Sequence, residues 1–427
     1  MGKYLKTFLK CAILHLFLVG NYSVAQNVVL KGGDIIIKEG TFLVVQGNLK
    51  VNTATLNSEI DLDGTILLHG DIENNSSGSV FFNQETVPNG WVVMPNANAI
   101  QHIKGSAFIH FENLSLSGSE KKLMNNNSSV NGILRLNAKF NLNSNNFILN
   151  NKNSSSLEHN GGFLFAETNP IQGIGSFQWS ISNNIETFKI PFGTGNSNIS
   201  DIPIIFQTIS AGSIDGGIVF STYPTDYTNT PFPDFVNSLN PYMPTKTADR
   251  FWLTDGDSYI HKPTSTLSLT YTQNDIESGN SISKSALSPI FYHNSGSIWS
   301  NYPTFFCDSL FNTMTVLNIS PNELAKNWTL SSDEISADIF FPNAFSPDLD
   351  GPNETFKPVM NFIPKQYAIY IYNRWGELVF TSNDPNNGWN GLFQNTACQI
   401  GTYSWIVKLL KPNGKEQHYK GIVSIVK

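Results

Sequence analysis

Two stretches near the start of the chain resemble each other, and this repeat constrains the fold more than any other feature. Residues 40–49 read Gly-Thr-Phe-Leu-Val-Val-Gln-Gly-Asn-Leu, and residues 64–72 read Gly-Thr-Ile-Leu-Leu-His-Gly-Asp-Ile. Their first glycines are 24 residues apart and their second glycines 23. Short apolar strands with Gly or Asn corners at such a period favour a parallel β-solenoid, because each turn covers the apolar face of its neighbour.

A looser third copy extends the repeat toward the middle of the chain. It begins with Asn-Gly-Ile-Leu-Arg-Leu at residues 131–136 and runs into the apolar segments 140–142 and 147–149. We therefore predict a β-solenoid-like region over residues 26–167. A meander of hairpins in a sandwich is the alternative that the same alternation permits.

The sequence pattern changes in the central region, which we delimit as residues 168–332. Longer, aromatic-rich strands occur there, for example at 177–181, 217–220 and 266–271, and Pro-containing loops separate them. One loop, residues 223–244, holds five prolines. Short strands with such turns are typical of a β-sandwich, so the prediction for the whole chain is an all-β protein.

Residues 1–25 have the three parts of a secretory leader. Lys3, Lys6 and Lys10 form a basic start, residues 12–19 are largely apolar, and Ser-Val-Ala at 23–25 is a small-x-small cleavage site. The apolar run is shorter than the roughly 20 residues of a spanning helix. We predict cleavage before Gln26, passage into the periplasm, and no transmembrane span in the mature chain.

Charge argues against nucleic acid as a partner. The chain has 26 basic and 33 acidic residues, and the leader contains three of the basic residues and none of the acidic ones. The mature chain therefore carries a net charge near −10. Such a surface repels the phosphate backbone.

The last ninety residues carry the most distinctive motifs. Residues 342–347 read Pro-Asn-Ala-Phe-Ser-Pro, an Asp-rich turn follows at 348–354, and an apolar strand is predicted at 367–372. Pro-Asn-Gly at 412–414 lies between two strand-like runs and predicts a hairpin, because Asn-Gly accepts the positive φ angles of a tight turn. The final apolar strand, 420–426, predicts docking into the domain's own sheet or recognition by another protein.

Taken in order, these motifs resemble the gliding motility-associated C-terminal domain, the type B sorting domain of the type IX secretion pathway. The resemblance covers residues 339–427 and implies an Ig-like β-sandwich domain, delimited as residues 338–427, that the outer-membrane type IX machinery recognises. It also implies that the protein is secreted or exposed on the outer cell surface. The motif residues that carry it are Asn373, Arg374, Trp375, Gly376, Trp389, Gly391, Lys420 and Gly421.

Few residues in the chain suggest a chemical site. Asp348, Asp350 and Glu354 bring three carboxylates to one turn and are candidate Ca²⁺ ligands, although Asp in a turn also caps backbone amides. The pair Asp61 and Asp63, like Asp71 and Glu73, points to one strand face at i and i+2. Such pairs perform acid–base chemistry in some solenoid enzymes, but solvated corner residues are the simpler interpretation.

Aromatic side chains offer a second kind of candidate. Trp252, Trp299 and Trp328 would bind carbohydrate if they were exposed, but large residues of a sandwich usually lie in its core. Arg374 beside Trp375 is either a recognition pair or an arginine stacked on an aromatic ring within the fold.

The sequence contains no nucleophile elbow, P-loop, zinc-binding helix motif or complete dinucleotide fingerprint. We therefore expect a non-catalytic surface protein whose passenger serves adhesion or surface structure. The alternatives are a secreted polysaccharide-processing enzyme and a carbohydrate-binding protein, either of which would take surface polysaccharide as its ligand.

Overall fold

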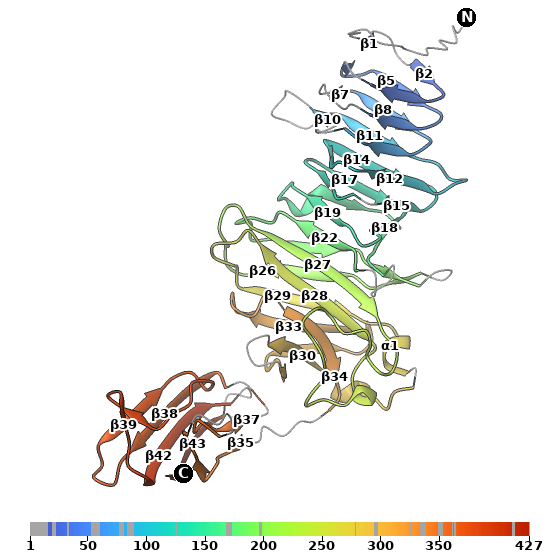
Figure 1. The fold of residues 1–427 in the computed structure, drawn as a ribbon. Helices are drawn as coiled ribbons and strands as arrows, with labels where there is room; N and C mark the ends of the chain where they lie inside the picture. Colours follow the sequence, from blue (N-terminus) through green and yellow to red (C-terminus); the bar gives the residue numbers. More distant parts are fainter. Residues whose placement is uncertain are drawn as a thin grey trace, which may run out of the picture. The chain divides into compact units, whose positions relative to one another are not determined.

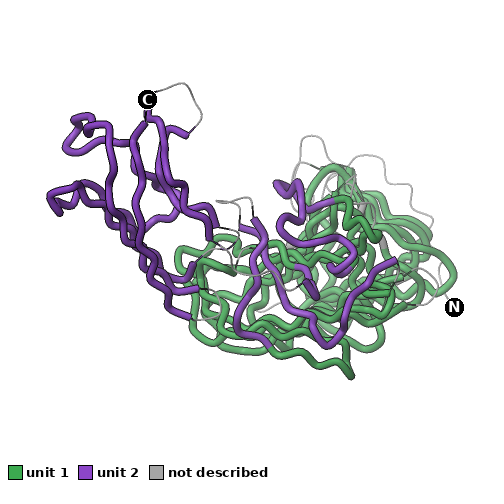
Figure 2. Tube along the Cα trace, turned by 90° about the horizontal axis from the view of Figure 1, so that it is seen from below, with its two compact units in different colours: residues 1–231, 249–278, 306–328 green, residues 232–248, 279–305, 329–427 purple. Residues whose placement is uncertain are grey.

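The computed structural model is built almost entirely of β-strands (Figure 1). It describes residues 16–18, 23–31, 34–52, 60–76, 81–82, 89–124, 126–167, 173–195, 199–277, 279–293, 298–324, 326–333, 339–348, 353–360, 362, 364–411 and 415–426. The chain forms two compact units, coloured separately in Figure 2. One contains residues 1–231, 249–278 and 306–328, and the other contains residues 232–248, 279–305 and 329–427.

Strands in the first part of the chain stack in parallel, turn upon turn (Figure 1). The first sheet contains β1 (Leu16–Leu18), β4 (Ile35–Ile37), β7 (Ile60–Leu62) and β10 (Phe81–Phe82). The second contains β2 (Ser23–Ala25), β5 (Phe42–Val45), β8 (Thr65–Leu68), β11 (Trp91–Met94), β14 (Asn113–Ser117), β17 (Leu134–Asn137) and β20 (Leu157–His159). The third contains β3 (Val28–Leu30), β6 (Leu49–Val51), β9 (Ile72–Asn74), β12 (Gln101–Gly105), β15 (Lys121–Met124), β18 (Lys139–Asn141) and β21 (Phe163–Phe165).

The predicted solenoid is confirmed, and the hairpin meander is wrong for this region. Each strand pairs with the strand one turn earlier, as in the parallel register of Leu49 with Ile72 and of Ile72 with Ile103. These three side chains are fully buried and stack along the interior. Alternate residues point outward, which is the two-residue period expected of strands with one buried face.

Backbone contact between turns explains the repeated glycines. A Cβ placed on Gly70 would lie 2.2 Å from the carbonyl oxygen of Gly47, so only glycine fits this corner. The neighbouring Asn48 supplies a hydrogen bond with its side chain in place of a backbone carbonyl. Its side-chain oxygen accepts the amide N–H of Asp71 at 2.8 Å. The Gly and Asn of the sequence repeat therefore join one turn to the next.

The predicted leader contributes to the same stack. β1 and β2 pair in parallel with β4 and β5. The rest of residues 1–25 lies outside the described residues, so cleavage before Gln26 stays a prediction.

A fourth sheet carries the solenoid into the central region without a break. Its parallel part contains β13 (Ile109–Phe111), β16 (Ser128–Val130), β19 (Asn146–Leu149) and β22 (Ser176–Trp179). It continues in antiparallel order through β27 (Gly217–Pro224), β28 (Arg250–Asp257) and β34 (Lys326–Ser331). The change of direction between β22 and β27 marks the end of the solenoid.

A fifth, antiparallel sheet packs on this continuation and completes a sandwich. Its order is β23 (Thr187–Ile190), β26 (Ile204–Thr208), β29 (Ser265–Thr270), β33 (Thr313–Ile319) and β32 (Phe305–Asp308). Aromatic rings join the two layers, with centroids 5.0 Å apart for Trp179 and Phe188 and 5.6 Å apart for Phe206 and Phe220. The smaller elements are β24 (Gly193–Thr194), β25 (Ser200–Asp201), α1 (Asn274–Glu277), the hairpin β30 (Ser288–His293) and β31 (Ile298–Asn301), and 3₁₀ turns at 154–156, 244–246 and 284–286.

A buried ion cluster lies where the solenoid meets the sandwich. Arg250 is almost completely buried and binds Glu167 at 2.7 Å and Asp275 at 3.1 Å. Its guanidinium also donates to the hydroxyls of Thr194 and Thr222. Because Glu167 follows the last strand of the third sheet, this cluster holds the final turn against the sandwich.

The C-terminal domain, residues 339–426, has its own sheets and core. Its main sheet has the order β36 (Ala344–Phe345), β43 (Glu416–Ile425), β42 (Gly401–Leu410), β38 (Gln366–Tyr372) and β39 (Leu378–Ser382). Two short pairs accompany it, β35 (Ile339–Phe340) with β37 (Val359–Met360) and β40 (Leu392–Phe393) with β41 (Thr396–Ala397).

Three expectations for this domain are met. The strand predicted at 367–372 is an inner strand, flanked by β39 and β42. β42 and β43 form the predicted hairpin, although its turn, residues 412–414, lies outside the described residues. The final strand docks into the domain's own sheet, between β42 and β36.

Candidate functional site

The first carboxylate pair of the solenoid is neutralised by a lysine from the preceding turn. The ammonium of Lys38 lies 3.4 Å from a carboxylate oxygen of Asp61 and 3.2 Å from one of Asp63. Both acids therefore act as partners of one exposed cation. The side chains of Asp61 and Asp63 are 22% and 17% exposed, so the pair is ion-paired and largely covered, and not freely solvated as the simpler interpretation expects.

The second pair is held in its ionised form. Burial raises the pKa of Asp71, but hydrogen bonds from Lys104 and His102 outweigh it and bring the pKa below its usual value. The hydrogen bond from Lys50 lowers the pKa of Glu73. A general acid for glycoside hydrolysis needs a raised pKa, so the shifts at Asp71 and Glu73 run in the wrong direction for that role.

The three candidate tryptophans belong to the core. Trp252, Trp299 and Trp328 are each fully buried. The indole N–H of Trp328 donates to the hydroxyl of Thr254 at 3.1 Å, and that of Trp299 donates to a backbone carbonyl. None of the three presents a ring face to a ligand.

The Asp-rich turn is closed by backbone hydrogen bonds at the residues that the structure describes. The amide of Ser346 donates to the carbonyl of Asn353, and the amide of Asp348 donates to the carbonyl of Ser346, both at 3.0 Å. Glu354 follows, and Asp350 lies outside the described residues. Within the described ranges no three His, Cys, Asp or Glu side chains gather as metal ligands. Ca²⁺ binding at this turn stays a prediction.

Three of the eight C-terminal motif residues shape the core of the domain. Trp389 is fully buried, and its ring centroid lies 4.8 Å from that of Tyr403. Gly391 has a φ of +75°, and a Cβ there would lie 2.9 Å from the ring of Pro347. Gly421 pairs with Trp405 across the hairpin and leaves room for its indole, since a Cβ would come within 2.5 Å of that ring. The adjacent Lys420 is exposed.

The remaining four motif residues, 373–376, form the turn between β38 and β39. The side-chain oxygen of Asn373 accepts the amides of Trp375 at 2.9 Å and Glu377 at 3.0 Å. Gly376 provides the positive φ, +79°, that closes the turn. The guanidinium carbon of Arg374 lies 5.2 Å from the ring centroid of Trp375, and that indole is 81% exposed. The pair is stacked as expected, but at the surface and not within the core.

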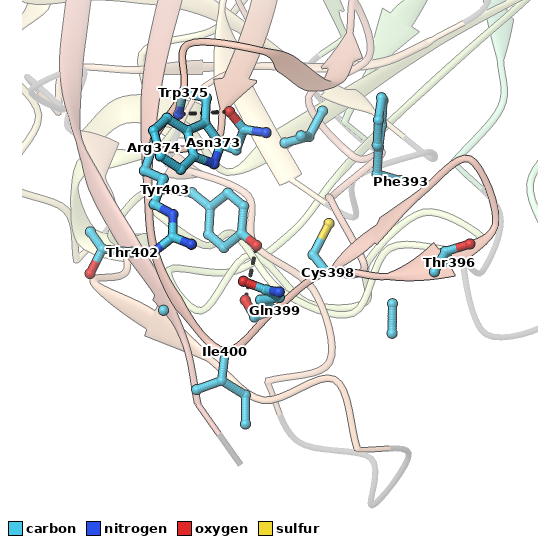
Figure 3. A pocket seen from close by; sticks show the side chains of 13 residues that line it. Asn373, Arg374, Trp375, Phe393, Thr396, Cys398, Gln399, Ile400, Thr402 and Tyr403 are labelled. Atoms are coloured by element: carbon cyan, nitrogen blue, oxygen red, sulfur yellow. Dashed lines mark hydrogen bonds between the residues drawn. The ribbon is translucent and has the colours of Figure 1, made fainter.

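A pocket of about 400 Å³ opens beside this turn (Figure 3). The turn residues line one part of it, and Phe393, Cys398 and Tyr403 line another. The Tyr403 hydroxyl donates to the carbonyl of Gln399 at 2.9 Å, and burial raises the pKa of the Cys398 thiol. Tyr403 belongs to the Gly-x-Tyr-x-Trp motif, whereas Phe393 and Cys398 carry no pattern that sequence reasoning had singled out.

Comparison with known proteins gives one match. No curated protein and no protein of known structure shows significant similarity to the chain. Among the described residues, no helix has the length and apolar character needed to cross a bilayer. Residues 339–425 match the family model of the CHU_C type IX secretion signal domain, so the protein is exported by the type IX pathway to the cell surface or the extracellular space.

Proposed function

We propose that the passenger, residues 26–332, is a non-catalytic adhesive or structural protein of the cell surface. The observation that carries this proposal is the outward face of the second solenoid sheet. Val44, Leu67 and Val93 lie in register on successive turns and point away from the interior. Strands about 4.8 Å apart turn these side chains into a continuous apolar row.

Polar and aromatic groups border the apolar row. The indole of Trp91 is partly exposed, and the guanidinium carbon of Arg135 lies 4.5 Å from its ring centroid. Arg135 also pairs with Glu158 on the next turn at 2.6 Å. Such a face offers a long, flat binding surface with few polar anchor points, which suits adhesion to an extended ligand.

The charges of the solenoid favour binding over catalysis. The carboxylates at 61, 63, 71 and 73 all pair with lysines, and those at 71 and 73 have lowered pKa values. A hydrolase of this architecture would need one carboxyl group that stays protonated near neutral pH.

Charge introduced on the apolar row tests the proposal. We expect the triple variant V44E/L67E/V93E to be exported normally but to lose most cell adhesion, measured as cells retained on polysaccharide-coated and uncoated surfaces. The matched control changes Lys50, Glu73 and Lys104 to alanine on the third sheet and should adhere like the wild type. Unchanged adhesion of the glutamate variant would refute the role of this face.

An activity measurement separates the alternatives. We expect the exported protein to release no reducing sugar from a panel of polysaccharides. Release that disappears in D61N/D63N, or in D71N/E73Q, would establish the polysaccharide-processing enzyme instead. Adhesion restricted to one polysaccharide, without release, would identify a carbohydrate-binding protein.

A further inference from the structure

The turn at residues 373–376 is rigid, yet its tryptophan contributes nothing to the core. Asn373 donates to the carboxylate of Glu377 at 2.9 Å in addition to accepting two backbone amides. These bonds fix the backbone of a turn that presents Trp375 to solvent. A hairpin needs no tryptophan at this position, and exposing so large an apolar ring is unfavourable unless something covers it.

The pocket beside the turn is bordered by a second exposed apolar side chain. Ile400 lines it and is 63% exposed, whereas Tyr403 also lines it but is buried. Figure 3 shows the residues of the turn and the segment from Cys398 to Tyr403 around the same hollow. Its volume of about 400 Å³ is in the range that holds a few side chains of a partner.

The pocket has a positive charge and no negative one. Arg374 is the charged residue that lines it, and no Asp or Glu does. In the described part of the chain, no carboxylate lies within ion-pair distance of the Arg374 guanidinium. Four cations of the solenoid, Lys38, Lys50, Lys104 and Arg135, differ in this respect, because each has an acidic partner. On a chain with excess negative charge, Arg374 is therefore available to an acidic group from outside.

We propose that this pocket is where the sorting domain is recognised by a protein of the outer-membrane export machinery. The segment that binds carries an acidic side chain next to an apolar one. The carboxylate pairs with Arg374, and the apolar side chain packs between Trp375 and Ile400. Exposed Trp and Arg beside a Tyr are the residue types that dominate binding energy at protein interfaces. The proposal rests on the export role of the domain.

The test follows export of the full chain in cells that have the type IX pathway. Trp375→Ala and Arg374→Glu should each reduce the exported amount at least tenfold and increase the periplasmic amount correspondingly. Arg374→Lys should fall between them and the wild type, because lysine keeps the charge but loses the planar stacking group. Phe340→Ala is the matched control, since Phe340 is 64% exposed in the same domain but does not line the pocket; it should be exported normally.

Two further measurements make the outcome decisive. The purified Trp375→Ala and Arg374→Glu proteins should melt at the wild-type temperature, because both side chains are exposed. Deletion of residues 339–427 should abolish export. If the deletion abolishes export while both pocket variants are exported normally, the pocket is not the recognition site and the export role stands. If the deletion has no effect, both ideas fail.

Other results would also overturn the proposal. Equal loss of export in Phe340→Ala and Trp375→Ala would show that the effect is not specific to the pocket. Normal export followed by release from the cell surface into the medium would show that the pocket holds the protein to a surface component, such as an anionic polysaccharide.

Discussion

The solenoid and the sorting domain are both all-β, but the strands that pair with each other are separated by very different lengths of sequence. In the solenoid, each strand pairs with the strand one turn away, and the interior is mostly aliphatic. In the sorting domain, Ala344 pairs with Ser424 at the opposite end of the domain, around a core rich in aromatic rings. A destabilising mutation should therefore unfold only the adjoining turns of the solenoid, whereas in the sorting domain it should destabilise the whole domain.

The largest effect is expected from Trp389→Ala. This side chain is fully buried, its indole N–H donates to the carbonyl of Leu392 at 3.0 Å, and its ring packs on Phe345 and Tyr403. Its removal should cost about 4 kcal/mol of folding free energy. Denaturant unfolding of the purified chain should show the sorting-domain transition shifted or absent. An unchanged transition would mean that the domain does not depend on this core.

The next effect concerns the end of the solenoid. Arg250→Met leaves Glu167 and Asp275 buried without their cation and should cost about 3 kcal/mol. Adding Glu167→Gln and Asp275→Asn should restore most of the loss, because no unpaired charge then remains. Thermal unfolding measures both steps, and Lys38→Met, at an exposed ion pair, is the control. If Arg250→Met matched this control, the buried cluster would not hold the last turn.

A backbone collision should produce a smaller and strictly local effect. Gly70→Ala places a methyl group against the carbonyl of Gly47 and should cost about 2 kcal/mol. Hydrogen exchange should show lost amide protection in the adjoining turns only. Thr65→Val, at an outward position of the same turn, should exchange like the wild type. Loss of protection throughout the sorting domain would remove the contrast between the two regions.

The smallest effect should depend on pH. Burial raises the pKa of Asp71, but Lys104 and His102 lower it overall, so its contribution to stability is present above about pH 4 and disappears as the pH falls through the lowered pKa. Asp71→Asn should therefore cost about 1 kcal/mol at neutral pH and nothing in strong acid. Urea unfolding at several pH values tests this. A difference that persists in acid would contradict the assignment.

The sequence predicted the solenoid well because its constraint is local. Gly47 and Gly70 must be glycines because the backbones of adjacent turns touch there, so the spacing of these glycines gives the length of one turn. The sorting domain was predictable for another reason: Trp389 and Gly421 occupy positions that the core allows few other residues to fill. The exposure of Trp375 was not predictable, because an Arg-Trp dipeptide reads the same in a core and on a surface. Ile400 belongs to no sequence motif, and its place beside the pocket could not be predicted because the pocket residues come together only on folding.

The stacking of the turns determines the axial length of the solenoid. Turns of different length are joined by the same kind of hydrogen bond, from a backbone amide to an asparagine side-chain oxygen, with partners 19 residues apart in one place and 31 in another. A whole turn is therefore a unit that can be gained or lost without altering the register of its neighbours. Each such event changes the axial length by about 4.8 Å, the spacing between strands. The length of the solenoid is therefore set by the number of its turns.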